Sequence, residues 1–187
     1  FSARGVKTID DLGRGLDKLP SPWLLSGMET MVAHLISAIK DRQKITIVAD
    51  FDADGATSCA VAVNGLQLLG AGGVSFVVPN RFEYGYGLTP EIVELVKRQR
   101  PDVIITVDNG ISSIDGVKAA QAAGIKVLVT DHHLPGHELP AADAIVNPNL
   151  PDDPFPSKAL AGVGVMFYVL LALRSRLREQ GWFEQQK

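Results

Sequence analysis

The stretch ITIVADFDADGATS, residues 45–58, places a β-branched run directly before three alternate aspartates and a glycine. Asp50, Asp52, Asp54 and Gly55 match the first half of an EF-hand calcium loop. An EF-hand also needs a preceding helix and an acidic twelfth residue, but residues 45–48 have the composition of a strand and the twelfth residue is Val61. The stretch therefore predicts a strand, an acidic turn and a helix, and it argues against a calcium loop.

The same order of strand and helix recurs along the chain. β-branched runs occupy residues 44–49, 74–78, 103–107, 126–130 and 144–146. Segments with helical periodicity occupy residues 56–69, 90–99 and 112–123. This alternation predicts an α/β fold with an open, mainly parallel five-stranded sheet flanked by helices.

We expect one domain over residues 1–187, built from three parts. They are an N-terminal lead-in at 1–43 with a helix at 27–41, a motif-bearing α/β core at 44–150, and a long C-terminal helix at 157–187. The proline-rich stretch 147–156 connects the last two as a loop. Because the chain starts at phenylalanine and stops soon after the long helix, we expect it to be a piece of a larger protein.

Composition narrows the class of protein. The chain is 46% hydrophobic and 21% charged with a net charge of -3, which argues against a broad basic surface for nucleic acid. No apolar run approaches the length of a membrane span, so we expect no membrane partner. The single cysteine, Cys59, rules out an internal disulfide, fits a cytoplasmic protein and is expected to be buried on a helix. For His34 and His137 we expect structural roles.

Polar side chains follow three of the predicted strands. They are Asp50, Asp52 and Asp54 after the first strand, Asp108 after the third, and Asp131, His132 and His133 after the fourth. Ligands of open α/β sheets gather beyond the carboxyl ends of the strands, so these side chains are expected to meet. Clustered like charges repel one another, and a divalent cation is the simplest neutraliser.

Carboxylates with one or two imidazoles suit Mn²⁺ best and Mg²⁺ as well, whereas structural Zn²⁺ normally has thiolate ligands. The carboxylates outnumber the needs of one octahedral ion, so we expect two ions in a complete site. Metal pairs stabilise the attacking and departing oxygens of an in-line phosphoryl displacement. The predicted reaction is metal-assisted phosphoester hydrolysis.

Three other α/β classes fit less well. A response-regulator receiver needs a lysine after the fifth strand, where this chain has Asn147 and Pro148. A haloacid-dehalogenase phosphatase needs Thr or Val at the position of Asp54. A dinucleotide-binding domain needs a glycine-rich turn after the first strand, and only Gly55 is present. Because all of these share a fold, only the site separates them.

The motifs together resemble those of the DHH phosphoesterase superfamily. DFDADG at 50–55, VDNG at 107–110 and TDHH at 130–133 carry the resemblance. PNRFEYGYGL at 79–88 and ALAGVGV at 159–165 are similar to segments of the RecJ-like single-strand-specific exonucleases. The resemblance implies a Mn²⁺- or Mg²⁺-dependent 5′-to-3′ exonuclease that acts on single-stranded DNA in recombination and repair.

The resemblance also implies roles for individual residues. It makes Asp52, Asp54, Asp108 and His132 metal ligands, with Asp50 either a further ligand or a group that orders a bound water. With His133, which would face the scissile phosphate or the leaving oxygen, the first four form the implied catalytic set.

The remaining implied roles are supporting ones. Asp131 and Asn109 would not bind metal themselves but would orient the ligands, with Asp131 orienting the imidazoles. Arg81 would contact a backbone phosphate, or alternatively form an ion pair with Glu83. Tyr84 and Tyr86 would stack on bases or pack their own loop.

The family has a further motif with another metal-binding aspartate, and a second domain, neither of which these residues contain. We therefore expect the fragment to be weakly active or inactive, and a single-strand-binding protein or helicase to bind through regions beyond it. We expect a monomer. Two alternatives stay open: a DHH-family oligonucleotide or cyclic-dinucleotide phosphodiesterase, and a non-catalytic DHH binding module, a class that loses metal ligands.

Overall fold

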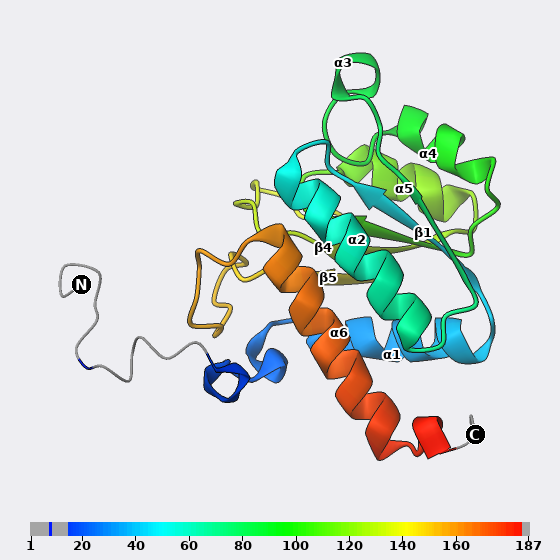
Figure 1. Cartoon of the computed structure of the whole chain (residues 1–187). Helices are drawn as coiled ribbons and strands as arrows, with labels where there is room; N and C mark the ends of the chain where they lie inside the picture. Colours follow the sequence, from blue (N-terminus) through cyan, green and yellow to red (C-terminus); the bar gives the residue numbers. More distant parts are fainter. Residues whose placement is uncertain (1–7, 9–14, 185–187) are drawn as a thin grey trace.

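A five-stranded sheet lies at the centre of the computed structural model, which describes residue 8 and residues 15–184 (Figure 1). The strands are β1 (Lys44–Ala49), β2 (Gly73–Val77), β3 (Val103–Val107), β4 (Lys126–Thr130) and β5 (Ala144–Val146). Their order is β2-β1-β3-β4-β5, and every neighbouring pair is parallel. The predicted α/β fold with a parallel five-stranded sheet is confirmed.

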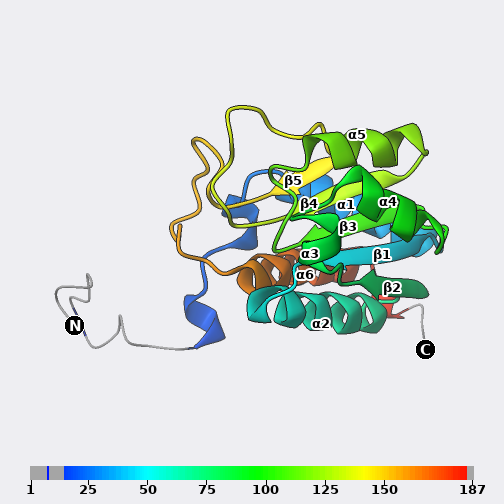
Figure 2. The same cartoon turned by 90° about the horizontal axis from the view of Figure 1, so that it is seen from above.

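Helices cover both faces of this sheet, as the view from above shows (Figure 2). On one face lie α1 (Met28–Lys40), α2 (Ala53–Leu68) and α6 (Gly162–Glu179); on the other lie α4 (Pro90–Lys97) and α5 (Ile114–Ala122). The short α3 (Arg81–Tyr84) stands beyond the carboxyl ends of the strands. Three 3-10 turns complete the described chain: η3 (Leu16–Lys18), η4 (Pro22–Leu24) and η5 (Trp182–Glu184).

The strands are apolar on both faces because both faces are covered. Ile45 and Ile47 of β1 pack in the core beneath α1, α2 and α6, whereas Val48 packs in the core beneath α4 and α5. In β3, Ile105 and Ile104 divide between the two cores in the same way. This double burial fixes the strand register, since a slip by one residue would exchange the two cores.

Several helix ends differ from the predicted ones for local reasons. Helix α2 begins at Ala53 rather than at residue 56, because Asp52 caps it by accepting from the backbone N–H groups of Asp54 and Gly55, both at 3.0 Å. The predicted long C-terminal helix is present within 157–187 but is shorter. Helix α6 runs from Gly162 to Glu179, and Gly181, whose φ of 68° is in the left-handed region, follows it. Residues 185–187 lie outside the described residues.

The lead-in helix runs from Met28, after Gly27, to Lys40 and matches its prediction closely. Of the predicted lead-in at 1–43, residues 1–7 and 9–14 lie outside the described residues. Cys59 is buried on α2, as expected. Within residues 15–184, no helix combines the length and apolar character needed to cross a membrane.

Candidate metal centre

The carboxyl ends of β1, β3 and β4 bring the predicted site residues to one edge of the sheet. Asp50 follows β1, Asp108 follows β3, and Asp131, His132 and His133 follow β4. Since β3 lies between β1 and β4 in the sheet, Asp108 is the central residue of the group. The topology therefore gathers side chains that lie more than eighty positions apart in the sequence.

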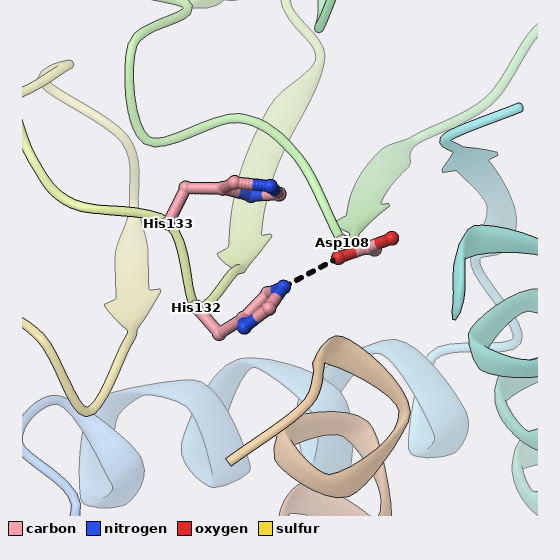
Figure 3. Close-up of side chains that lie close together, drawn as sticks. All are labelled: Asp108, His132 and His133. Atoms are coloured by element: carbon pink, nitrogen blue, oxygen red, sulfur yellow. Dashed lines mark ion pairs between the residues drawn. The ribbon is translucent and has the colours of Figure 1, made fainter. Parts of the chain in front are cut away.

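Two overlapping groups of side chains have the spacing of metal ligands. Asp50, Asp52 and Asp108 form one group, and Asp108, His132 and His133 form the other; within each group the candidate ligand atoms all lie within 4.8 Å of one another. Figure 3 shows the second group, in which His132 Nε2 lies 3.1 Å from Asp108 Oδ1. Asp108 belongs to both groups and would be among the residues that hold metal ions here.

Asp108 is held in an unfavourable environment for an isolated carboxylate. Its φ of 61° is in the left-handed region, it is 1% exposed, and its Oδ1 is buried without a hydrogen bond of good geometry. Burial, followed by the charges of Asp54 and Asp52, raises its pKa from 3.8 to about 7. A cation at this position would supply the positive charge that the buried carboxylate of Asp108 lacks as a partner.

Gly162 lets the start of α6 approach this carboxylate. A Cβ at residue 162 would lie 2.6 Å from Asp108 Oδ1 and 2.8 Å from Asp108 Cγ. Any larger residue would therefore push α6 away from the site or move the carboxylate.

Asp54 joins two helices instead of entering either group of candidate ligands. Its Oδ2 accepts from the N–H of Gly162 and its Oδ1 from the N–H of Val163, both at 2.8 Å. The carboxylate therefore caps α6 from the first turn of α2. It remains close to the site, because His132 Nε2 is 3.6 Å from its Oδ2.

Asp131 is buried and organises the turn that carries the two histidines. Its Oδ1 accepts from the backbone N–H groups of His132 and His133 and lies 2.7 Å from His133 Nδ1. Its Oδ2 accepts from the N–H of Ile111, which ties this turn to the one after β3. Asp131 thus contacts the ring of His133 but only the backbone of His132.

Opposing effects act on the charge of His133. Burial disfavours the charged ring, but the hydrogen bond and charge of Asp131, with smaller contributions from Asp108 and Asp50, outweigh it and raise the His133 pKa. The hydroxyl of Tyr86 lies 3.2 Å from His133 Nδ1.

Arg81 lies on α3 and points back to the sheet. Its Nη2 is 2.7 Å from Asp50 Oδ1, and its guanidinium lies 5.7 Å from the centre of the Tyr86 ring. The alternative prediction, an ion pair between Arg81 and Glu83, is wrong. Arg81 does form an ion pair, but its acidic partner is Asp50. Tyr84 is half-buried and packs against the core beneath α4 and α5.

Residues 44–186 match the sequence profile described as the DHH family, N-terminal domain. The chain belongs to the DHH family.

Relatives and solved structures of this DHH chain agree with that assignment. It is 53% identical over 186 residues to the single-stranded-DNA-specific exonuclease RecJ of Escherichia coli strain K12, covering 99% of this chain but only 32% of the relative. A crystal structure of RecJ in complex with Mn²⁺ from Thermus thermophilus is 34% identical with a TM-score of 0.77, covering 94% of this chain and 24% of that one. A crystal structure of exonuclease RecJ bound to manganese is 37% identical with a TM-score of 0.75, covering 85% and 39%.

Two asparagines of the DHH chain support the site without having been predicted to do so. Asn147 Nδ2 donates to the carbonyl of His133 at 2.9 Å, and Asn149 Nδ2 donates to the carbonyl of His132 at 2.6 Å. Both follow β5, whose carboxyl end meets the same edge of the sheet. Their position directly after a predicted strand could have indicated this role, although residues 147–156 were predicted only as a connecting loop.

Asn109, in contrast, fastens the backbone. Its Nδ2 donates to the carbonyls of Val48 at 3.1 Å and Val107 at 2.9 Å, and so ties the ends of β1 and β3 together. It supports Asp108 through the chain rather than through a contact with a candidate ligand. His34 lies on α1 and His137 in a loop, and neither belongs to the two candidate ligand groups.

Proposed function

We propose that this chain is the metal-binding core of a DHH exonuclease that hydrolyses the phosphodiester bonds of single-stranded DNA from the 5′ end. The observation that carries the proposal is the pair of ligand groups that share the buried Asp108. Similarity to single-stranded-DNA-specific exonucleases over 99% of the chain supports it. A binding module without catalysis is disfavoured, since the carboxylates and imidazoles of both groups are present.

The donor set fits Mn²⁺ or Mg²⁺, because it combines carboxylate oxygens with imidazole nitrogens and contains a buried oxygen in need of a partner. We assign Asp50, Asp52, Asp108 and His132 as ligands, with two ions in a complete site. Asp54 is assigned as a further ligand that also holds α6 in place. When bound, such ions act as Lewis acids and generate a nucleophilic hydroxide from water.

The chain's own residues would position the substrate and move a proton. His133 has a raised pKa and is held by Asp131, so its ring can carry the proton that a departing oxygen requires. Arg81 is 38% exposed in its side chain and can exchange its contact with Asp50 for one with a backbone phosphate. Asp131 and Asn109 hold the turns that present these groups.

The chain spans 32% of the length of the E. coli relative, and the proposal assigns the remaining functions to the rest of a longer protein. Residues 1–187 would act as one DHH-type domain. The family's last metal-binding aspartate and second domain would complete the site, and a single-strand-binding protein or helicase would bind elsewhere. We place the protein in the cytoplasm, as a monomer that serves recombination and repair.

The complete protein should degrade 5′-labelled single-stranded DNA with Mn²⁺, and its Asp108→Ala variant should not. The 187-residue chain alone should bind Mn²⁺ in a calorimetric titration, and Asp52→Ala should weaken that binding. Cleavage of cyclic dinucleotides without any cleavage of DNA would favour the small-substrate phosphodiesterase instead. Absence of Mn²⁺ binding by the unmodified chain would reject the metal centre itself.

A further inference from the structure

Two exposed aromatic residues are adjacent in sequence to residues of the site. Phe51 lies between Asp50 and Asp52 and is 52% exposed, and Phe82 follows Arg81 and is 87% exposed. Scattered exposed apolar residues are normal on protein surfaces. Here, however, each exposed ring belongs to a residue that is the sequence neighbour of one member of the Asp50–Arg81 ion pair, and Asp50 is itself a candidate ligand. The exposed rings of Phe51 and Phe82 are therefore candidates for contact with a ligand bound at the site.

Phe82 is mounted on a turn whose backbone is held in several places. Asn80 Oδ1 accepts from the N–H of Phe82 at 3.0 Å, and the carbonyl of Asn80 accepts from the next two N–H groups. The hydroxyl of Thr89 donates to the carbonyl of Tyr84 at 3.3 Å, and Arg81 is fixed to Asp50. The ring is therefore presented to solvent from a fixed backbone, which lowers the entropy lost when a ligand binds.

Arg81 and Phe82 offer two different contacts from consecutive positions. The guanidinium of Arg81 is directed to the candidate metal ligands through Asp50, whereas the ring of Phe82 is almost wholly in solvent. A single nucleic-acid strand presents the same pair of features, a charged phosphate and an apolar base face, in each nucleotide. Proteins that bind single strands combine positive charge along the backbone with aromatic rings on which bases stack.

We propose that Phe82 stacks on a nucleobase beside the scissile phosphodiester and so favours strands with unpaired bases over small phosphoesters. This assignment rests on the proposed function. In a duplex the faces of a base are occupied by its neighbours, so only a base free to leave the stack can cover the ring. Phe82 is thus a positioning residue, while the groups around Asp108 carry the chemistry.

The test measures binding of a short oligothymidylate with phosphorothioate links and a 3′ fluorophore, by fluorescence anisotropy in Mn²⁺. The proteins are the unmodified complete protein, Phe82→Ala, Phe82→Trp and the control Leu68→Ala. Leu68 is 84% exposed, which is similar to Phe82. It is the last residue of α2, whereas the first turn of α2 lies at the site, so Leu68 is remote from the candidate ligands. A second probe is an abasic oligomer of the same length.

We expect Phe82→Ala to weaken oligothymidylate binding roughly 5- to 150-fold, the loss typical of one stacked base. Phe82→Trp and Leu68→Ala should retain the affinity. On the abasic oligomer, Phe82→Ala and the unmodified protein should bind alike, since no base is left to stack.

Two outcomes would overturn the assignment while leaving the proposed function intact. They are an unchanged affinity of Phe82→Ala for oligothymidylate, and a loss that persists on the abasic oligomer and so reflects a disturbed loop. If the unmodified protein bound no oligothymidylate at all, the proposed function would fail as well.

Discussion

Replacing Asp108 by asparagine should stabilise the metal-free protein at neutral and alkaline pH. The side chain is 1% exposed, and burial together with the charges of Asp54 and Asp52 raises its pKa from 3.8 to about 7. Asparagine keeps the shape of the side chain and removes the charge. The proposed metal ligand Asp108 is therefore also expected to destabilise the fold when no metal is bound.

The sign follows from proton linkage. The folded-state pKa of Asp108 lies above the unfolded value, so the folded protein holds a proton that the unfolded chain releases between about pH 4 and pH 7. Stability from this group is complete below the unfolded pKa and is lost as the pH rises through the folded pKa. A shift of about three units corresponds to about 4 kcal/mol at pH 8 and to about 2 kcal/mol near pH 5.5.

Urea unfolding in EDTA, followed by circular dichroism, measures the difference between the two proteins. We expect Asp108→Asn to be more stable by up to about 4 kcal/mol at pH 8, with an advantage that shrinks towards zero near pH 4. Added Mn²⁺ should raise the stability of the unmodified protein and leave the variant nearly unchanged. A variant that is less stable at pH 8, or a stability difference that does not change with pH, would show that the charge of Asp108 does not destabilise the folded protein.

Three further changes give distinct outcomes. Asp54→Asn should destabilise the protein in EDTA by about 1–3 kcal/mol, because it leaves a backbone N–H of Gly162 or Val163 without its acceptor; an unchanged melting temperature would contradict the capping role. Arg81→Ala should lower the slope of log affinity for oligothymidylate against log salt by about 0.7, the loss of one phosphate contact, and an unaltered slope would show that Arg81 touches no phosphate. Cys59 is buried and its thiol pKa is raised by burial, so iodoacetamide should modify it only in urea; rapid labelling of the folded protein would contradict this placement.

The strands and the edge at which they end were predictable because both depend on local pattern. Runs such as 103–107 are buried at every position, which is the pattern of a strand covered on both faces. Once the sheet is parallel, residues such as Asp50 and Asp108 must meet at its carboxyl edge. The gathering of the acidic and histidine side chains therefore followed from the order of elements alone.

Contacts between segments that are distant in the sequence could not be predicted from local pattern. Asp54 accepts from Gly162 and Val163, more than one hundred positions away, and no periodicity in either segment encodes that pairing. The sequence suggested Glu83 as an acidic partner for Arg81, yet the guanidinium reaches from α3, which stands beyond the strand ends (Figure 1), to Asp50. The partners of Asp54 and Arg81 depend on the final tertiary packing of the helices and loops.

Anomalous X-ray diffraction from crystals grown with Mn²⁺ can show whether divalent ions bind around Asp108 at the carboxyl edge of the sheet. We expect manganese peaks within bonding distance of Asp108 and of members of the two ligand groups, and no such peaks in Asp108→Ala. Manganese bound only elsewhere on the protein, or an unaltered site in the variant, would contradict this expectation.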